Sequence, residues 1–379
     1  MTINKYYIIA GEASGDLHGG NLIAAIKGKD PQCLIRCWGG DKMAAAGGAL
    51  VKHYRELAFM GFIEVVKNLG TILKNLKFCK EDILRFKPDV LVLIDYPGFN
   101  LRMAKWAKQQ GIKVVYYISP QVWAWKENRV KMMKQCIDKM LVILPFEKDY
   151  FKNKWDWDVT YVGHPLLEEI AKKQTADNEL LIRDASGSVN QKPVVALLPG
   201  SRKQEIEKKL PVMLEVSKAF PDHQFVIAQA PSLDHSFYQT FTSPYPNVSI
   251  VNNRTYDLLL QSTAALVTSG TATLETALFE VPEVVCYKGS AISYQIAKRV
   301  INIKYISLVN LIMDKEVVKE LIQDEMNVKN LTGELGLLLN NAEKKQQIKS
   351  DYQELKSKLS AAGAASEKAA AIIIASATQ

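Results

Sequence analysis

The sequence lacks a long uninterrupted apolar run. A helix that crosses a bilayer needs roughly 18 or more apolar residues, and the most apolar stretch, Ala369–Ala377, is too short. Near the N-terminus, Tyr6–Ala10 is followed at once by Gly11 and Glu12, which leaves no room for the apolar core of a signal peptide. We therefore expect a cytoplasmic protein without a membrane span.

Cysteine and histidine are both scarce. The five cysteines are odd in number and form no C-x-x-C pair, and the five histidines show no metal-ligand spacing. Asp156 and Asp158 form a D-x-D pattern that can hold a divalent ion, but they lie in a turn rich in Lys and Trp, away from any glycine loop. We therefore expect no metal ion and no cofactor.

Neither sign of charge dominates, although 48 Lys and Arg against 40 Asp and Glu leave a net charge of +8. A positive balance favours anionic partners such as nucleotides, nucleic acids or a phospholipid surface. The charge is spread along the chain, and aromatic residues do not alternate with basic ones as they do in single-strand binders. We therefore expect no binding to nucleic acid.

Short apolar, β-branched runs alternate with helix-like segments, which predicts parallel sheets covered by helices. The expected strands are Tyr6–Ala10, Leu34–Trp38, Val90–Ile94, Val114–Ile118, Met140–Leu144, Val159–Val162, Val194–Leu198, Phe225–Ala228, Val248–Val251, Ala265–Thr268 and Glu283–Cys286. The expected helices of the first half are Gly19–Lys27, Leu69–Phe86, Leu101–Gln109 and Arg129–Gln135.

A chain of 379 residues is long enough for two domains. The polar stretch Thr175–Lys192 is the best candidate for the boundary between them, and Ala342–Gln379 reads as terminal helices. We predict an α/β protein with two Rossmann-like domains, whose parallel sheets face each other across a cleft. Ligands of such sheets bind outside the carboxyl ends of the strands, so we expect the functional residues in the loops there.

Two of these loops carry carboxylates in the first half. Gly11–Asp16 follows the first strand, and its glycines allow close approach to a ligand, although an ordinary turn capped by Ser14 or Asp16 explains it as well. Asp95 follows the apolar run Val90–Ile94, where low solvation raises the basicity of a carboxylate. We predict that Asp95 accepts a hydroxyl proton, with a helix-capping role as the alternative.

A third loop, Ser119–Trp125, contains two tryptophans. They fit either core packing or an apolar wall for an acyl chain or sugar face. Lys126, Arg129 and Lys131 follow, and they fit either a phosphate site or a solvated helix face.

The second half contains two glycine loops after strands. In the first, Gly200, Ser201 and Arg202 bring backbone N–H groups, a hydroxyl and a guanidinium together, which suits a diphosphate. In the second, Ser269–Thr271 opens a helix, and Glu275 lies one turn further on, where it can accept from both ribose hydroxyls.

These loops belong to an ordered set of motifs. The set consists of AGEASGD (10–16), IDYPGFN (94–100), SPQVWAW (119–125), LPFE (144–147), GHP (163–165), LLPGSR (197–202), SGTATLE (269–275) and SLVNL (307–311). In this order they closely resemble the lipid-A-disaccharide synthases, bacterial glycosyltransferases of the GT-B fold. The resemblance spans roughly residues 5 to 340.

The resemblance implies an inverting transfer of 2,3-diacylglucosamine from its UDP carrier to the 6-hydroxyl of 2,3-diacylglucosamine 1-phosphate, which gives a β-1,6-linked disaccharide 1-phosphate and UDP. Asp95 matches the catalytic aspartate of the family. The residues expected at the UDP-sugar are Gly200, Ser201, Arg202, Ser269, Gly270, Thr271, Glu275 and Asn310. Those expected at the acceptor are Glu12, Ser14, Asp16, Trp123 and Arg129.

The expected organisation is therefore an acceptor-binding domain over 1–170, a UDP-sugar-binding domain over 171–340 and C-terminal helices over 341–379, packed on the first domain or on a partner subunit of a homodimer. The acylated, anionic substrates imply a peripheral position on the inner face of the bacterial inner membrane. Phe59–Phe86, which mixes apolar residues with lysines, fits an interfacial helix or an ordinary amphipathic helix.

Two alternatives stay open. One is another UDP-sugar enzyme of the same fold, either a peptidoglycan-type transferase or a sugar-nucleotide epimerase. The other, from a different class, is a non-catalytic module that binds a nucleotide or a lipid. A requirement for Asp95 in transfer but not in UDP binding separates an enzyme from such a module.

Overall fold

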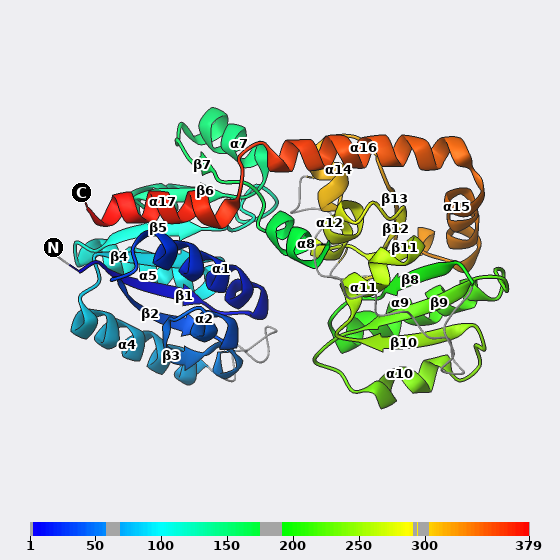
Figure 1. The fold of residues 1–379 in the computed structure, drawn as a ribbon, viewed down its shortest axis with the longest axis horizontal. Helices are drawn as coiled ribbons and strands as arrows, with labels where there is room; N and C mark the ends of the chain where they lie inside the picture. Colours follow the sequence, from blue (N-terminus) through cyan, green and yellow to red (C-terminus); the bar gives the residue numbers. More distant parts are fainter. Residues whose placement is uncertain (1–2, 58–68, 175–191, 291–293, 295–302, 379) are drawn as a thin grey trace. The chain divides into compact units, whose positions relative to one another are not determined.

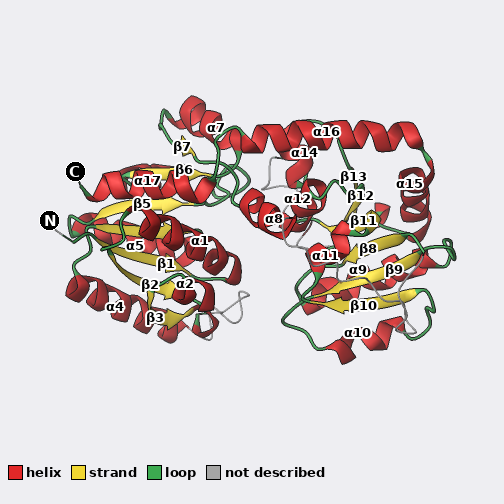
Figure 2. Cartoon of the chain, in the orientation of Figure 1, coloured by secondary structure: helices red, strands yellow, loops and turns green. Residues whose placement is uncertain are grey.

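The computed structural model describes residues 3–57, 69–174, 192–290, 294 and 303–378, which form two compact units (Figure 1). Unit 1 comprises Met1–Pro165 and Leu359–Gln379, and unit 2 comprises Leu166–Lys358. Each unit contains one parallel sheet with helices packed against it, as in Rossmann-like domains (Figure 2).

Unit 1 is built on a seven-stranded sheet in the order β3-β2-β1-β4-β5-β6-β7. The strands are β1 (Lys5–Ala10), β2 (Leu34–Gly39), β3 (Ala49–His53), β4 (Val90–Ile94), β5 (Lys113–Tyr117), β6 (Lys139–Val142) and β7 (Thr160–Tyr161). The order reverses between β1 and β4, which pair in parallel from Tyr6 opposite Val90 to Ala10 opposite Ile94. The loops after these two strands therefore meet where open sheets bind ligands.

Helices bury both faces of this sheet. They are α1 (Ala13–Lys29), α2 (Asp41–Ala45), α4 (Leu69–Phe86), α5 (Pro97–Gln109), α6 (Arg129–Cys136), α7 (Pro145–Trp155) and α17 (Ala365–Ala377), with a 3-10 turn, η1, at Tyr54–Glu56. Because strand side chains alternate between faces, Tyr7 and Ile9 join the core under α4, α5 and α6, whereas Ile8 joins the core under α1 and α17.

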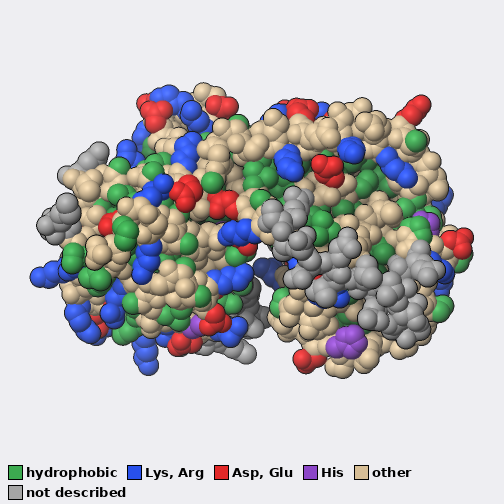
Figure 3. Space-filling model, in the orientation of Figure 1, with side chains coloured by type: hydrophobic (Ala, Val, Ile, Leu, Met, Phe, Trp, Pro, Cys, Tyr) green, Lys and Arg blue, Asp and Glu red, His purple; other side chains and the backbone are tan. Residues whose placement is uncertain are grey.

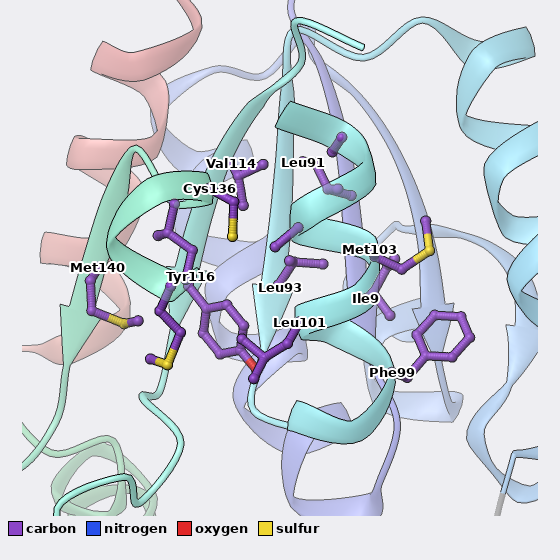
Figure 4. Close-up of a cluster of buried hydrophobic side chains, with 14 of the residues drawn as sticks. Ile9, Leu91, Leu93, Phe99, Leu101, Met103, Val114, Tyr116, Cys136 and Met140 are labelled. Carbon is purple, nitrogen blue, oxygen red and sulfur yellow. The ribbon is translucent and has the colours of Figure 1, made fainter. Parts of the chain in front are cut away.

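The core under α5 holds the end of β4 in place. Figure 4 shows Leu93 of β4 and Tyr116 of β5 facing Leu101 of α5 within one apolar cluster. All five residues of β4 are buried, as expected for a central parallel strand with helices on both faces. The residue that follows, Asp95, therefore starts from a rigid support.

The last helix of the chain completes unit 1. Ala369, Ala370 and Ile373 of α17 are buried in the same cluster as Ile8 and Val92. Helix α17 is thus part of the layer that covers the second face of this sheet, together with α1 (Figure 1).

Unit 2 repeats the architecture with a six-stranded sheet in the order β10-β9-β8-β11-β12-β13. Its strands are β8 (Val194–Leu198), β9 (Gln224–Gln229), β10 (Val248–Asn252), β11 (Ser262–Thr268), β12 (Glu283–Tyr287) and β13 (Lys319–Ile322). Its helices are α8 (Leu166–Gln174), α9 (Lys203–Ser217), α10 (His235–Thr242), α11 (Thr255–Leu260), α12 (Thr271–Leu278), α14 (Leu308–Met313), α15 (Val328–Asn340) and α16 (Ala342–Ser360), with a 3-10 turn, η2, at Gln323–Glu325. The order reverses between β8 and β11, so the Gly200 and Gly270 loops meet at the second switch point.

The predicted α/β class is confirmed, and each expected strand lies on an observed one. Two edge strands, β3 and β13, were not expected, because they are short and carry charged residues among the apolar ones. The expected start of the first helix at Gly19 was wrong, since α1 already begins at Ala13. Gly15 lies against Ala10 at the end of β1, and the buried Asp16 accepts hydrogen bonds from Gly40 and Met43, so tertiary contacts hold this first turn. The expected boundary at Thr175–Lys192 falls almost wholly outside the described residues.

Within the part of the chain that the structure describes, no helix is both long and apolar enough to cross a bilayer. All five cysteines are buried and unpaired by disulfides.

A partly buried ion pair joins β2 to α4 in unit 1. The Asp82 carboxylate is 2% exposed and accepts hydrogen bonds from Arg36 Nε at 2.8 Å, Arg36 Nη2 at 2.7 Å and the Tyr7 hydroxyl at 2.7 Å. Trp38 Nε1 in turn donates to the Tyr7 hydroxyl at 2.9 Å. This network contributes to stability because each buried polar group has a partner.

We expect Asp82→Ala to lower the free energy of unfolding by about 2–4 kcal/mol, because it leaves the Arg36 guanidinium and the Tyr7 hydroxyl without their acceptor. Urea denaturation measures the effect. Glu81→Ala is the matched control, since the neighbouring Glu81 is exposed and 3.9 Å from Lys77, and it should change stability by less than about 0.5 kcal/mol. Equal effects of the two substitutions would contradict a structural role for the network.

Candidate active site

The turn after β4 has an unusual backbone. Asp95 and Tyr96 have φ values of 44° and 48°, in the left-handed region that non-glycine residues rarely adopt. Side chains from neighbouring elements hold it there. Asn100 Nδ2 donates to the Asp95 carbonyl at 2.8 Å and to the Ile94 carbonyl at 3.1 Å, and the Tyr116 hydroxyl also donates to the Asp95 carbonyl. Hydrogen bonds from α5 and from β5 thus fix the backbone that carries the Asp95 side chain.

The environment of Asp95 makes it a better base than an ordinary aspartate. Burial raises the pKa of Asp95 from 3.8 to about 6, and the negative charge of Glu12 adds to the effect. Glu12 is close because Ala10 and Ile94 are paired, so the residues that follow β1 and β4 lie next to each other. A carboxylate with this pKa is ionised at neutral pH and can accept a proton.

Gly11 is required by the close approach of the two turns. A Cβ atom at this position would lie 2.3 Å from two ring carbons of Tyr96, a distance no side chain tolerates. The glycine thus allows the Tyr96 ring to pack over the end of β1. This packing brings the Glu12 and Asp95 loops together.

Asp16 has a structural role, and its contact with the acceptor stays a prediction. Its carboxylate is buried and accepts from three backbone N–H groups, those of Gly40 at 2.7 Å, Met43 at 3.0 Å and Lys42 at 3.2 Å. These bonds fix the start of α2. Glu12, in contrast, is exposed at the N-cap of α1, and Ser14 is exposed in the first turn of that helix.

The tryptophan loop after β5 contributes an aromatic and basic cluster. Trp123 is half-buried and packs edge-on against Phe146 at 5.0 Å between ring centroids. Trp125 is exposed, with Lys126 Nζ 4.2 Å and the Arg129 guanidinium 5.8 Å from its ring centroid. Trp123 packs inward, as the interpretation of core packing expects. Trp125 faces solvent beside two cations, as the interpretation of an apolar wall expects.

Arg129 also influences the end of β5. Burial and the charge of Asp95 raise the pKa of the Tyr116 hydroxyl well above its ordinary value, and the positive charge of Arg129 opposes them. The guanidinium thus acts on the hydroxyl that holds the Asp95 turn.

Glu147, at the start of α7, is a buried carboxyl group in the same region. Burial raises its pKa to about 7, and the nearby Trp123 and Ser119 side chains partly oppose this. The Leu144 backbone N–H donates to Glu147 at 3.0 Å, which caps the helix. We assign Glu147 to the support of the tryptophan loop.

Unit 2 has a pocket of about 280 Å³ at the carboxyl ends of β8, β9 and β11. Of the residues predicted to bind the donor, six line it: Gly200, Ser201, Ser269, Gly270, Thr271 and Glu275. The structure therefore brings the two glycine loops together. It adds the loop after β9, at Gln229–Pro231, and Thr255, which the sequence did not single out because they carry no glycine and no charge.

Glu275 is held in one orientation within this pocket. The Tyr256 hydroxyl donates to Glu275 Oε1 at 2.8 Å, and burial raises the pKa of the Glu275 carboxyl. The second oxygen is not used in this bond. Tyr256 was missed by sequence reasoning, because nothing in its surroundings distinguishes it from a core tyrosine.

Two predicted donor residues lie outside the pocket lining. Arg202 is the N-cap of α9; its side chain is 69% exposed and lies 3.6 Å from Glu205. Asn310 is 0% exposed, and its amide is fully engaged: Oδ1 accepts from the Val317 and Val318 N–H groups, and Nδ2 donates to the Val318 carbonyl and to Glu320. Asn310 therefore fixes the connection from α14 to β13, and its contact with the donor stays a prediction.

Asp156 and Asp158, which form the D-x-D pattern, are exposed side chains that both pair with Lys152, at 3.4 and 3.2 Å. They lie after α7 in unit 1, whereas the glycine-loop pocket belongs to unit 2.

Solved structures define the class to which the fold belongs. A putative UDP-N-acetylglucosamine 2-epimerase from Listeria monocytogenes superposes with a TM-score of 0.67, with 12% identity, over 99% of this chain and 96% of that one. A glycotransferase of kitacinnamycin superposes with a TM-score of 0.66, with 14% identity, over 99% of this chain and all of that one. The fold is therefore GT-B, as the motifs predicted.

Sequence similarity is more specific. Residues 6–375 match the family described as lipid-A-disaccharide synthetase. The lipid-A-disaccharide synthase of Syntrophus aciditrophicus is 39% identical over 380 residues, covering 99% of this chain and 98% of that protein. The chain belongs to the lipid-A-disaccharide synthetase family, and it is a glycosyltransferase.

The raised pKa of Asp95 predicts a pH-dependent effect on stability. Since the folded state binds this proton more tightly than the unfolded state, ionisation of Asp95 destabilises the fold as pH rises from about 4 to above 6. We expect Asp95→Asn to raise the free energy of unfolding by about 1–3 kcal/mol at pH 8 and to change it little at pH 4.

Thermal denaturation across this pH range measures the difference. Asp149→Asn, on the exposed side of α7, is the matched control and should show no such pH dependence. A stabilisation by Asp95→Asn that is equal at both pH values would contradict the raised pKa.

Proposed function

We propose that this chain transfers 2,3-diacylglucosamine from its UDP carrier to the 6-hydroxyl of 2,3-diacylglucosamine 1-phosphate, which forms a β-1,6-linked disaccharide 1-phosphate and UDP. Membership of the family supports this substrate pair. The observation that carries the proposal is the turn after β4. There a half-buried carboxylate with a pKa of about 6 is held at the strand-order reversal of unit 1.

Asp95 acts as the general base in this reaction. Its carboxylate takes the proton of the acceptor 6-hydroxyl as the oxygen attacks the anomeric carbon of the donor. The bond from that carbon to the diphosphate oxygen breaks, and UDP leaves with the electron pair. Because one displacement occurs, the configuration at the anomeric carbon inverts. The raised pKa brings the basicity of Asp95 closer to the operating pH, which favours proton transfer.

The pocket of unit 2 holds the UDP part of the donor. Glu275, oriented by Tyr256, accepts hydrogen bonds from the ribose hydroxyls through its carboxylate. The N-termini of α9 and α12 direct backbone N–H groups to the diphosphate, and the exposed Arg202 adds a mobile positive charge. These groups stabilise the negative charge that develops on the leaving UDP.

The acceptor is bound by unit 1. Glu12 lies beside the Asp95 turn, Ser14 follows in the first turn of α1, and Trp123 offers an apolar surface to the sugar or its acyl chains. Arg129, with Lys126, supplies positive charge for the 1-phosphate of the acceptor.

We expect Asp95→Asn to lower kcat by about 10²- to 10⁴-fold, because the amide cannot accept the proton. The assay follows UDP release and disaccharide formation from the two diacylated substrates. UDP affinity, measured by calorimetry, should stay unchanged.

Glu12→Gln is the comparison variant. It keeps the base and removes a nearby negative charge, so the acid limb of the pH–rate profile should move to lower pH. Wild-type transfer by Asp95→Asn, with normal UDP binding, would eliminate Asp95 as the base. Conversion of UDP-N-acetylglucosamine to its C2 epimer by the wild-type protein would favour the epimerase alternative.

We also propose that unit 1 lies peripherally on an anionic membrane surface, the inner face of the inner membrane, through one face of α4. Leu73, Phe78 and Leu84 are exposed along this helix, and the exposed Lys74, Lys77 and Glu81 lie between them in the sequence. An amphipathic helix with apolar and basic residues on its outer face suits a lipid interface. Basic and acidic side chains are interspersed over the molecular face in Figure 3, so α4 offers the more specific contact.

The triple variant Leu73→Ser, Phe78→Ser, Leu84→Ser should lower binding to vesicles that contain about 30% anionic lipid by roughly tenfold, because the apolar area available for insertion is lost. Co-sedimentation measures binding. The control is Leu260→Ser with Leu337→Ser, two exposed leucines of unit 2. Vesicle binding equal to that of the wild type would eliminate α4 as the contact.

A further inference from the structure

Helix α9 carries a lysine on its buried side. Ile206, Leu210 and Met213 form the apolar stripe that packs on the sheet, and Lys209 lies within this stripe with only 2% of its surface exposed. Burial lowers the pKa of Lys209, while Glu205 opposes the effect by favouring the charged form. A buried ammonium group is costly, so its position calls for a function.

The ammonium group lies against the glycine turn that opens α9. Lys209 Nζ is 3.6 Å from the point where a Cβ of Gly200 would be, and Gly200 lines the pocket of unit 2. Gly200 has a φ of 116°, in the region that favours glycine. A side chain at this position would therefore be strained and would also separate the ammonium from the pocket.

Glu205 bridges two cations loosely at the same turn. Its Oε2 is 3.8 Å from Lys209 Nζ, and its Oε1 is 3.6 Å from Arg202 Nη1. Both distances exceed that of an ordinary hydrogen bond. The carboxylate also lines the pocket. One anionic side chain thus lies between two cations without a close bond to either.

A second polar group, in the lining of the same pocket, has no hydrogen-bond partner among the described residues. Thr268, the last residue of β11, is 8% exposed and lines the pocket, and its hydroxyl makes no hydrogen bond to any described residue. Thr268 is paired with Cys286, and the charge of Lys209 reaches the Cys286 thiol, whose pKa it lowers against the larger effect of burial. Lys209 thus lies behind the Gly200 turn, which lines the pocket, and Thr268 lines the same pocket from the end of β11.

We propose that Lys209 and Thr268 form a buried anion-binding floor beneath the Gly200 turn, and that this floor binds a phosphate of the UDP diphosphate in place of the Glu205 carboxylate. The proposal rests on the proposed function, because it assumes a UDP-sugar in this pocket. The ammonium supplies charge, and the Thr268 hydroxyl donates a hydrogen bond. The Glu205 carboxylate then turns toward Arg202 and solvent, so the site exchanges one anion for another.

An anion-binding floor also explains why one cation, Lys209, is buried beneath the Gly200 turn while another, Arg202, is exposed to solvent. Arg202 is exposed, so water and salt screen its attraction for phosphate. The charge of Lys209 acts from a buried position, where the same attraction is stronger. As charge builds up on the leaving diphosphate, a fixed buried cation stabilises it without reorganisation.

The test compares the affinity of the full-length protein for UDP and for uridine, which has no phosphate. Lys209→Met should weaken UDP binding by about ten- to a hundredfold and leave uridine binding unchanged, because only the phosphate contact is lost. Lys208→Met, on the exposed side of the same helix, is the matched control and should alter both by less than about twofold. Calorimetry measures the UDP affinity, and NMR titration measures the weaker uridine affinity.

Three further variants keep the test valid if Lys209→Met does not fold. Thr268→Val should weaken UDP binding by about two- to tenfold, and Thr268→Ser, which keeps the hydroxyl, should restore it. Glu205→Gln should strengthen UDP binding by a few fold, because the competing carboxylate is removed, and this gain should disappear in combination with Lys209→Met.

Each outcome either supports or overturns the anion-binding floor. A selective loss of UDP affinity in Lys209→Met, with a gain in Glu205→Gln, supports the floor. An equal loss for UDP and uridine shows that Lys209 is structural and overturns the floor, as does an unchanged UDP affinity in both Lys209→Met and Thr268→Val. If the wild-type protein binds no UDP, the donor site of the proposed function fails as well, which separates that failure from failure of the floor alone.

Discussion

Two reversals of strand order determine where this protein can do chemistry. In unit 1 the sheet changes direction between β1 and β4, and in unit 2 it does so between β8 and β11. Because parallel strands end at the same edge, each reversal leaves two loops side by side with no crossover helix between them. The Glu12 and Asp95 loops meet at the first reversal, and the Gly200 and Gly270 loops meet at the second. The other features of both sites depend on these two juxtapositions.

Each site places a charged group where its ionised form is less stable than in water. Burial raises the pKa of Asp95 and of Glu275 and lowers that of Lys209. Such positions cost stability, and only the surrounding structure maintains them. The buried strand β4 and the hydrogen bonds to the Asp95 carbonyl do this in unit 1, and Tyr256 does it for Glu275 in unit 2. The protein thus uses neutral donors to orient its charged groups.

The sequence predicted the central strands and the four loops because both leave local signals: apolar runs, and glycines or carboxylates at their ends. It did not predict β3 and β13, since edge strands need no continuous apolar pattern. Asp16 and Asn310 lie in motifs that resemble binding loops. Only the structure shows that their side-chain oxygens accept hydrogen bonds from backbone N–H groups. Lys209 did leave a signal, a lysine at the spacing of the buried stripe of α9, but the meaning of that lysine depends on Gly200 across the turn.

Glu12 and Asp95 show how two carboxylates on adjacent loops take different roles. Asp95 emerges from a buried strand and a left-handed turn, whereas Glu12 is an exposed N-cap residue of α1. Burial raises the pKa of the half-buried Asp95, and the negative charge of the exposed Glu12 raises it further. The exposed carboxylate thus acts on Asp95 through its electrostatic field. The pairing of Ala10 with Ile94 sets the distance over which this field acts, so the register of two central strands tunes the basicity of the residue at their end.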